Sequence, residues 1–160
     1  MARIWGTALK GVGLFGLQEG GVSDREGIVT VSHTPITAVV IAYNDEPNMR
    51  ACLESSTCAD EIIVVDSHST DATARISREF TEQVYQHDFH GFGRLRNEAL
   101  AHATHDWVFS LDTDERATPE LRDEIRQVLA AGPQADAYFV PRKNYFLGRW
   151  IKHCGWFPDY

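Results

Sequence analysis

The strongest constraint on the fold is a set of short apolar runs that alternate with helical patterns. Three of these runs, ITAVVIA at 36–42, EIIVVD at 61–66 and WVFSL at 107–111, are continuous and rich in β-branched or aromatic residues. Such runs are typical of strands that are buried on both faces of a sheet. Strands that alternate with helices pair in parallel through right-handed crossovers. The sequence therefore predicts an α/β fold with an open, mostly parallel sheet and helices on both faces.

Two shorter strands are expected at 83–86 and 137–140. The most clearly marked helix follows the run at 107–111: Thr118 suits its N-cap, Pro119 suits its first turn, and Gly132 suits its end. The other expected helices run through Met49 and Leu53, through Ile76 to Phe80 with capping side chains between Ser67 and Asp71, and through Leu95, Ala99 and Leu100.

Residues 1–34 differ in character from the rest of the chain. They are rich in glycine and show no clean hydrophobic period, and Pro35 opens a different kind of segment. We expect a poorly structured N-terminal extension over 1–34 and a single domain over 35–160. No apolar run approaches the roughly 20 residues of a membrane span, and no signal peptide is expected. The apolar residues near the N-terminus leave peripheral membrane contact open.

Charge and cysteine content narrow the class of protein. The formal net charge of -8 and the lack of a clustered basic segment argue against nucleic acid as a partner. The three cysteines include no CxxC pair and leave an odd thiol in any disulfide scheme, which favours a reducing cytoplasm. An acidic protein can still bind a phosphorylated ligand if it recruits a cation.

Polar residues follow the predicted strands directly. In open α/β sheets, ligands bind at the carboxyl ends of the strands. This rule selects Tyr43, Asn44, Asp66 and Asp112, which we expect to lie along one edge of the sheet. For Asp66 a second interpretation stays open, in which its carboxylate caps the turn at 67–71.

Three acids stand within four positions in Asp112-Thr113-Asp114-Glu115. They repel one another, so without a counter-charge one of them should have a raised pKa or turn to water. A hard cation such as Mg²⁺ would neutralise them, because it binds one or two carboxylates together with waters or phosphates. We therefore predict that Asp112 and Asp114 hold a metal ion. For Glu115 we expect a solvated position that favours the start of the next helix through its dipole.

The blocks VVIAYNDE, ADEIIVVDSHSTDAT, GFGRLRNEAL and WVFSLDTDERATPEL resemble the family 2 glycosyltransferases in order and type. The later run from Arg142 to Trp150, together with GWFPD at 155–159, is similar to the bacterial lipopolysaccharide core β-1,4-glucosyltransferase branch. The resemblance implies the nucleotide-diphospho-sugar transferase (GT-A type) fold. It further implies inverting transfer of a sugar, expected to be glucose, from a UDP-sugar to a hydroxyl of a lipid-linked saccharide. Such an enzyme is expected in the cytoplasm, at the inner face of the cytoplasmic membrane.

The resemblance also implies roles for individual residues. The metal, Mg²⁺ or Mn²⁺, would be held by the aspartate-x-aspartate motif. The expected base, which removes the proton of the acceptor hydroxyl, is the nearby carboxylate of Asp159. The contacts with the donor nucleotide fall on Ala42, Tyr43, Asn44, Asp66 for the uridine, Arg96 and Asp112, and the metal motif falls on Asp112 and Asp114.

Two features of the sequence depart from the family pattern. His68 stands where the family usually has glycine, at a position suited to positive φ or a close ligand approach. The chain ends at Tyr160, where the family continues, so we expect a truncated acceptor-binding part. Two alternatives stay open: a nucleotidyltransferase or phosphotransferase that uses the same acids, and a sugar-nucleotide-binding module without turnover.

Overall fold

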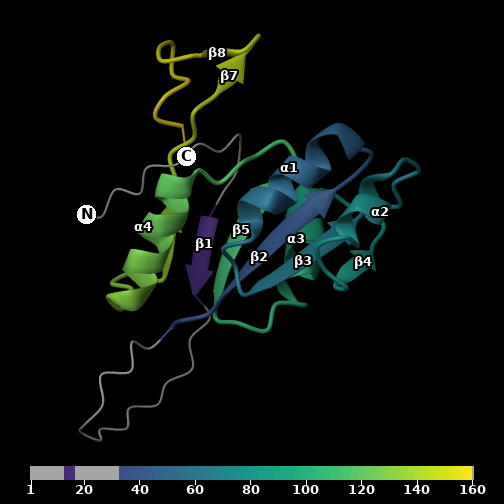
Figure 1. The fold of residues 1–160 in the computed structure, drawn as a ribbon, viewed down its shortest axis with the longest axis horizontal. Coiled ribbons are helices and arrows are strands. Elements are labelled where there is room, and N and C mark those ends of the chain that lie inside the picture. Colours follow the sequence, from purple (N-terminus) through teal and green to yellow (C-terminus); the bar gives the residue numbers. More distant parts are fainter. Residues whose placement is uncertain (1–12, 17–32, 160) are drawn as a thin grey trace, which may run out of the picture.

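The computed structural model describes residues 13–16 and 33–159 (Figure 1). Its main body is a twisted sheet with helices packed on it, and a small hairpin near the C-terminus projects from this body. In chain order the elements are β1 (Gly13–Gly16), β2 (Ile36–Ala42), α1 (Glu46–Ser56), β3 (Glu61–Asp66), α2 (Thr73–Ser77), β4 (Val84–Gln86), α3 (Phe92–Leu100), β5 (Trp107–Asp112), α4 (Pro119–Ala130), β6 (Ala137–Phe139), β7 (Tyr145–Phe146) and β8 (Arg149–Trp150).

Six strands form the main sheet, in the order β4-β3-β2-β5-β1-β6. The strands from β4 to β5 are all parallel, and Val39 of β2 lies opposite Ile63 of β3 on one side and Ser110 of β5 on the other. The chain leaves β2 toward β3 and β4 and then returns to the other side of β2 as β5. This reversal makes the gap between the carboxyl ends of β2 and β5 the switch point at which ligands bind in such sheets. The predicted mostly parallel sheet is confirmed.

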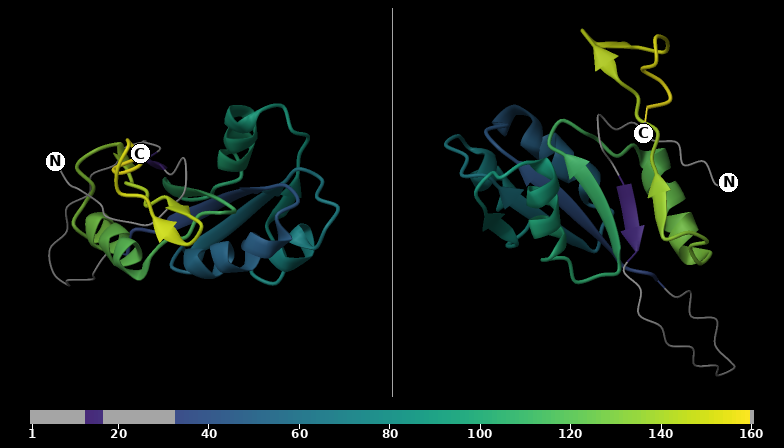
Figure 2. Two further views of the ribbon diagram at one scale, coloured as in Figure 1. Left: turned by 90° about the horizontal axis from the view of Figure 1, so that it is seen from above. Right: turned by 180° about the vertical axis from the view of Figure 1, so that it is seen from behind.

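Helices cover both faces of the sheet because successive residues of each central strand point to opposite sides. All seven residues of β2 are buried. Val40 packs in a core with residues of α1, α2 and α4, whereas Val39 packs in a second core with Leu95 and Ala99 of α3. Figure 2 shows α3 alone on one side of the sheet and α1, α2 and α4 on the other. Each large aliphatic side chain buried in this way contributes about 1.5–3 kcal/mol.

The last helix of the main body begins and ends where the sequence predicts. Thr118 is the N-cap of α4, and its hydroxyl accepts a hydrogen bond from Leu121 N at 3.2 Å. Pro119 occupies the first turn, where its missing N–H costs nothing. Gly132 follows the helix with a φ of 79°, a conformation that favours glycine.

The second helix is shorter and earlier than predicted. The sequence predicts a helix through Ile76 to Phe80, but α2 spans Thr73–Ser77 and the chain then turns. The N-cap of α2 is Ala72, which has no capping side chain, and the Asp71 carboxylate before it accepts a hydrogen bond from Thr73 N at 2.9 Å. This contact fixes the turn from which the helix begins at Thr73.

The N-terminal segment contributes a strand that the sequence analysis did not predict. The backbone of Gly13–Gly16 forms β1, which pairs antiparallel with both β5 and β6 and so separates them. Residues 1–12 and 17–32 of the expected extension lie outside the described residues. Of the two weaker strands that were predicted, 83–86 and 137–140, each is present in a three-residue form.

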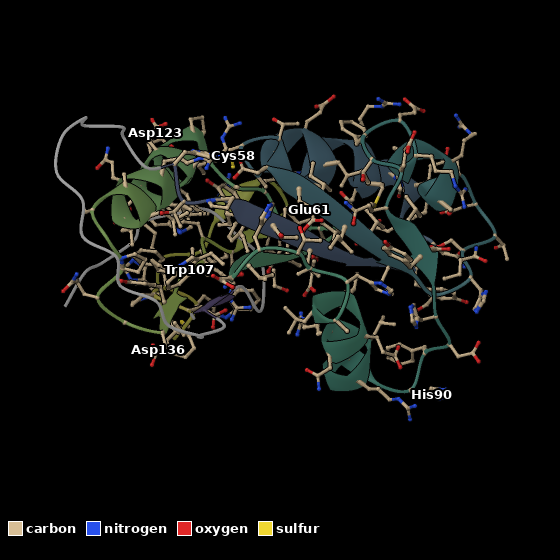
Figure 3. All side chains as sticks on the ribbon, turned by 90° about the horizontal axis from the view of Figure 1, so that it is seen from below. Cys58, Glu61, His90, Trp107, Asp123 and Asp136 are labelled. Carbon is tan, nitrogen blue, oxygen red and sulfur yellow. The ribbon has the colours of Figure 1, made fainter. Side chains whose placement is uncertain are left out.

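A buried acid anchors the edge of the sheet opposite to the switch point. Glu61, labelled in Figure 3, begins β3. Its carboxylate accepts hydrogen bonds from Thr37 Oγ1 at 2.5 Å, from Thr104 N at 3.0 Å and from Gln83 Nε2 at 3.0 Å. These contacts join β2, β3 and the loop before β5, so they hold the strands in register.

The chain after β6 leaves the sheet. Strands β7 and β8 form a two-stranded antiparallel hairpin that stands clear of the main body (Figure 1). The segment returns at Asp159, whose backbone carbonyl accepts a hydrogen bond from Arg142 N at 2.7 Å. Within the described part of the chain, no helix combines the length and the apolar character that crossing a membrane requires.

Candidate functional site

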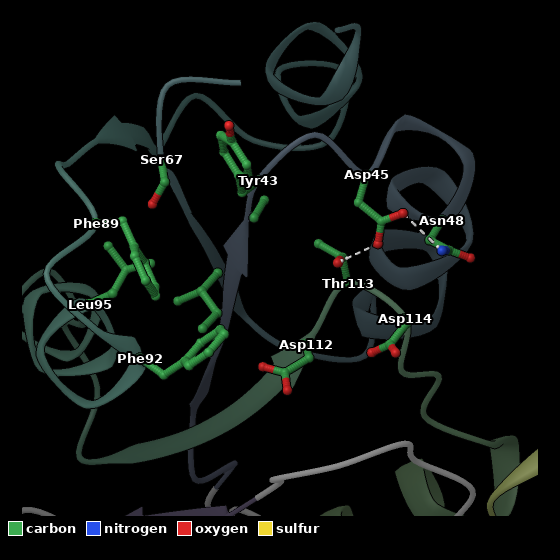
Figure 4. Close-up of a pocket in the computed structure, with 12 residues that line it drawn as sticks. Tyr43, Asp45, Asn48, Ser67, Phe89, Phe92, Leu95, Asp112, Thr113 and Asp114 are labelled. Atoms are coloured by element: carbon green, nitrogen blue, oxygen red, sulfur yellow. Dashed lines mark hydrogen bonds between the residues drawn. The ribbon is translucent and has the colours of Figure 1, made fainter. Parts of the chain in front are cut away.

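A cavity of about 860 Å³ opens at the carboxyl ends of β2 and β5 (Figure 4). It therefore lies at the switch point that the strand order defines. Residues from the ends of β2, β3 and β5, from the start of α1 and from α3 meet there. The lining residues are Ile41, Ala42, Tyr43, Asp45, Asn48, Ser67, Phe89, Phe92, Leu95, Asp112, Thr113 and Asp114.

The two predicted metal ligands share this cavity. Asp112 is the last residue of β5 and is half-buried, and Asp114 is exposed two residues later. Burial raises the pKa of Asp112; the opposing charge and hydrogen bond of Arg96 lower it only in part, and the charge of Asp114 raises it further. Arg96 Nη2 lies 2.6 Å from Asp112 Oδ1 and partly neutralises it. Arg96, which the sequence predicts as a contact of the donor nucleotide, is thus placed beside Asp112.

Glu115 does not occupy the solvated position that we expected. It is fully buried, and its Oε2 accepts a hydrogen bond from Asp112 N at 3.0 Å. Burial, assisted by the nearby charges of Asp112 and Asp114, raises the pKa of Glu115 to about 9. The expectation of a helix-start role was wrong, because the turn after β5 points this side chain inward. The pKa values of two acids of the cluster, Asp112 and Glu115, are raised, and for both the largest cause is burial, with the repulsion expected from the sequence adding to it.

A set of side-chain contacts fixes the loop after β2 against the loop after β5. Thr113 Oγ1 donates to Asp45 Oδ2 at 2.6 Å, and Asn48 Nδ2 donates to Asp45 Oδ1 at 2.9 Å (Figure 4). Arg116 donates to the carbonyl oxygens of Thr113 at 2.7 Å and of Asn48 at 3.0 Å. The acids on both loops are therefore held in a defined relation before any ligand binds.

The oxygen donors of this site suit a hard divalent cation. Asp112 and Asp114 offer carboxylate oxygens into one cavity, and their mutual repulsion would be relieved by a positive ion. In residues 13–16 and 33–159, no group of three or more His, Cys, Asp or Glu side chains is arranged to hold a metal. Two carboxylates alone leave most of the coordination of such an ion to waters or to oxygens of a ligand.

Two of the predicted donor contacts point into a loop instead of the cavity. Asp66 is fully buried, and its carboxylate accepts hydrogen bonds from Ser69 N at 3.0 Å and from Ser69 Oγ. Asn44 Oδ1 accepts a hydrogen bond from Thr70 N at 2.7 Å. The capping interpretation of Asp66, which the sequence left open, matches these contacts. Ala42 and Tyr43, by contrast, line the cavity.

The conformation of His68 agrees with the family's usual glycine at this position. Its φ is 57°, in the left-handed region, and His68 Nε2 lies 3.0 Å from Asp88 Oδ1. Histidine adopts this region more readily than bulky or β-branched residues do. His68 thus adopts the backbone conformation for which glycine is suited.

Asp159 lies outside the cavity. Arg142 Nη2 donates to Asp159 Oδ1 at 2.8 Å, and Asn144 Nδ2 donates to Asp159 Oδ2 at 3.1 Å. Arg142 is buried, and its charge also acts to lower the pKa values of Asp112 and Glu115. Arg142 therefore pairs directly with Asp159 and also acts through its charge on the acid cluster.

Residues 37–157, well over half of the chain, match the family described as Glycosyl transferase family 2. The chain belongs to glycosyl transferase family 2.

Individual relatives of this family 2 member are bacterial, phage and archaeal. The lipopolysaccharide core biosynthesis glycosyltransferase LpsC of Rhizobium meliloti (strain 1021) is 31% identical over 119 residues, which cover 71% of this chain and 44% of LpsC. Glycosyltransferase SunS of Bacillus phage SPbeta is 35% identical over 102 residues, which cover 61% of this chain and 24% of SunS. The chain therefore spans less than half the length of these curated relatives.

Solved structures support the same fold. The mannosyltransferase PcManGT from Pyrobaculum calidifontis, solved in complex with GDP-Man and Mn²⁺, matches with a TM-score of 0.52 and 28% identity over 64% of this chain and 34% of that chain. The S. aureus TarS structure of residues 1–349 matches with a TM-score of 0.51 and 29% identity over 59% of this chain and 32% of that chain. These neighbours are glycosyltransferases of the GT-A type, which confirms the predicted fold class.

Several cavity residues of this family 2 domain escaped the sequence analysis. Ser67 directly follows β3 and Asp45 comes three residues after β2, so the strand-end rule could have selected them as it selected Tyr43. Phe89 and Phe92 gave no such signal, because their position on the cavity depends on how the loop after β4 folds back over the sheet. An aromatic residue in a loop is normally indistinguishable from a core residue in sequence alone.

Proposed function

We propose that this chain binds the donor in a metal-dependent glycosyltransferase that moves a sugar from a UDP-sugar to a hydroxyl of a lipid-linked saccharide, with inversion. We take glucose as the sugar and a lipopolysaccharide core as the acceptor. The observation that carries the proposal is that Asp112 and Asp114 share a cavity with the end of β2 at the switch point of the sheet. The similarity to LpsC supports the acceptor, and the GDP-Man and Mn²⁺ in PcManGT support a nucleotide-sugar and a divalent ion.

In this proposal, Asp112 and Asp114 would hold Mg²⁺ or Mn²⁺, and the donor diphosphate would complete its coordination. The bound ion supplies Lewis-acid stabilisation of the negative charge on the leaving UDP. Arg96 already lies against Asp112, so its guanidinium is placed to donate to phosphate oxygens when the donor enters. Ala42 and Tyr43 contribute the wall of the donor site. Asn44 and Asp66 shape that wall through the loop at 67–71.

We propose Asp159 as the base. The acceptor oxygen would attack the anomeric carbon while the bond from that carbon to the UDP oxygen breaks, and the hydroxyl proton would pass to the Asp159 carboxylate. Arg142 and Asn144 orient this carboxylate. A single displacement of this kind inverts the configuration at the anomeric carbon. Because the acceptor is lipid-linked, we place the enzyme in the cytoplasm, in peripheral contact with the inner face of the cytoplasmic membrane.

Calorimetry of UDP-glucose binding, with and without Mn²⁺, tests the proposal. We expect Mn²⁺ to strengthen binding to the wild type, and Asp112→Ala to weaken the Mn²⁺-dependent binding at least about tenfold because a charged ligand of the ion is lost. Asp123→Ala is the matched control, because Asp123 is an exposed acid on α4 away from the cavity (Figure 3). Binding that ignores both Mn²⁺ and Asp112→Ala would contradict the proposal.

A product assay then separates enzyme classes. A glycosyltransferase releases UDP when an acceptor is supplied. Release of pyrophosphate or phosphate would instead identify a nucleotidyltransferase or phosphotransferase that uses the same acids. Intact binding without any product from the full-length protein would identify a sugar-nucleotide-binding module.

A further inference from the structure

The cavity has two chemically different halves (Figure 4). Asp45, Asp112 and Asp114 make one half acidic. On the side away from Asp45 and Asp114, Figure 4 shows Phe89 and Phe92. A ligand that fills the whole cavity must therefore combine a part that binds a cation with a flat or apolar part.

Phe89 and Phe92 form an exposed aromatic pair at this second half. Their ring centroids are 5.1 Å apart with an interplanar angle of 76°, the edge-to-face arrangement that aromatic pairs favour. The two residues remain 53% and 65% exposed in spite of this contact. Gly91, with a φ of 104°, makes the turn that places Phe92 at the start of α3. The pair thus presents ring surface to the cavity instead of to the protein core.

A buried hydroxyl beside the aromatic pair lacks a partner. Ser67 lines the same cavity and is only 7% exposed, and its Oγ has no hydrogen-bond partner among the described residues. An unsatisfied buried polar group costs about 1–3 kcal/mol, so a polar ligand atom that pairs with it gains binding energy. The neighbouring Asp66 already accepts from Ser69 N and Ser69 Oγ and does not line the cavity, so Ser67 is the polar side chain that the end of β3 presents to a ligand.

The order of the strands fixes how a donor would lie across these groups. Ser67 follows β3 and Asp112 ends β5, and β2 lies between these two strands. Two strand spacings amount to about 10 Å. A nucleoside diphosphate bound to a cation at Asp112 and Asp114 would therefore direct its nucleoside toward Ser67 and the aromatic pair.

We propose that Phe89 and Phe92 form the stacking platform for the nucleobase of the donor, and that Ser67 Oγ hydrogen-bonds a polar atom of the same nucleoside. This inference rests on the proposed function, because it assigns residues to the nucleoside part of the donor site. Asp66 then acts as a positioning residue, which holds the loop that carries Ser67. Stacking on an aromatic ring accepts any base, so the platform supplies affinity, and Ser67 contributes the polar selection.

The test compares two ligands that share the diphosphate and differ in the nucleoside. Calorimetry in Mn²⁺ is carried out with UDP and with inorganic pyrophosphate on the wild type, Phe89→Ala, Phe92→Ala and Ser67→Ala. Because the rings are nearly perpendicular, a planar base stacks face-on on one of them while the other supports that ring edge-on. We expect one Phe variant to weaken UDP binding about tenfold, the scale of a lost base–aromatic stack, the other to weaken it less, and both to leave pyrophosphate binding unchanged. Ser67→Ala should weaken UDP binding several-fold with the same selectivity.

Three further variants sharpen the test. Phe92→Trp should retain UDP affinity because it keeps a ring, whereas Phe92→Leu keeps apolar bulk and should lose it. Phe139→Ala is the matched control, because Phe139 is 71% exposed and lies on β6, outside the cavity. Both Phe89 and Phe92 are more than half exposed, so we expect their variants to fold, which circular dichroism of each variant checks.

The binding results distinguish failure of the stacking platform from failure of the proposed UDP-sugar donor. UDP affinity that is unchanged in Phe89→Ala and Phe92→Ala, or retained in Phe92→Leu, would overturn the platform. Equal losses for UDP and pyrophosphate would overturn it as well, because the pair would then shape the cavity without contacting the base. A wild type that binds Mn²⁺-pyrophosphate but no UDP refutes the platform and the proposed UDP-sugar donor together, whereas UDP binding insensitive to the Phe variants refutes the platform alone.

Discussion

Three neighbouring residues hold Asp112, and each contacts a different group of Asp112. Its carboxylate pairs with Arg96, its backbone N–H donates to Glu115, and its carbonyl oxygen accepts from Cys52 Sγ at 3.4 Å. Burial raises the pKa of Cys52 to about 12, so the thiol stays protonated and can donate. The carboxylate is therefore pre-oriented, which reduces the entropy that a metal ligand loses when the ion binds.

Glu115 should matter for stability as a neutral hydrogen-bond acceptor. With a pKa of about 9 it is protonated at pH 7, so Glu115→Gln keeps both its charge state and its shape. Glu115→Ala leaves Asp112 N without its acceptor, and we expect it to be less stable than Glu115→Gln by about 1–3 kcal/mol in urea denaturation. Equal stability of the two variants would mean that the contact with Asp112 contributes nothing.

Asp60 should make stability depend on pH in the acid range. Burial alone would raise its pKa, but hydrogen bonds from His33, Ile36 N and Arg126 outweigh burial and lower the pKa to about 2. A lowered pKa means that the unfolded chain binds the proton more tightly, so this contribution is complete above pH 4 and is lost as the pH falls toward 2. In urea denaturation, the wild type should exceed Asp60→Asn in stability at pH 5, and the difference should shrink between pH 4 and pH 2. A difference that is constant with pH would contradict this account.

At the scale of elements, α4 connects the acid cluster to the rest of the fold. Its N-cap Thr118 follows the DTDERA segment, and Ala117 N donates to Ser55 Oγ of α1 at 3.1 Å. The start of α4 therefore fixes the loop that carries Asp114.

The N-cap of α4 can be tested directly. Thr118→Ala removes the acceptor for Leu121 N and should cost about 1 kcal/mol in thermal or urea denaturation. Thr118→Ser keeps a capping hydroxyl and should retain most of the stability. If the two variants lose the same amount, the side-chain cap is not the source of the effect.

The elements that the sequence predicts well are those whose own residues determine them. The continuous apolar runs of β2, β3 and β5 are buried on both faces and read as strands without further information. β1 was missed because its GLFG sequence has no strand period, and only its backbone pairing with β5 and β6 makes it a strand. The predicted position of α2 was wrong because the helix begins after Ala72, an N-cap without a side-chain hydrogen bond, instead of after one of the capping side chains between Ser67 and Asp71.

At the scale of the whole molecule, the location of the site was predictable and part of its composition was not. The strand-end rule brought Tyr43 and Asp112 to one cavity because parallel strands end at the same edge. The burial of Glu115 was not predictable, since an acid beside two other acids resembles a solvated one. The position of Phe89 depends on contacts between segments that are distant in sequence, and a local pattern cannot encode them.

The central claim is that Asp112 and Asp114 hold a divalent ion against the diphosphate of a nucleotide. The most direct measurement is a crystal structure of the protein with UDP and Mn²⁺, with the ion located by anomalous scattering. We expect the Mn²⁺ peak within about 2.0–2.6 Å of carboxylate oxygens of both residues and of UDP phosphate oxygens, the range of hard-cation coordination. A peak elsewhere in the molecule, or a UDP bound in this cavity with both carboxylates turned away from its diphosphate, would contradict the claim.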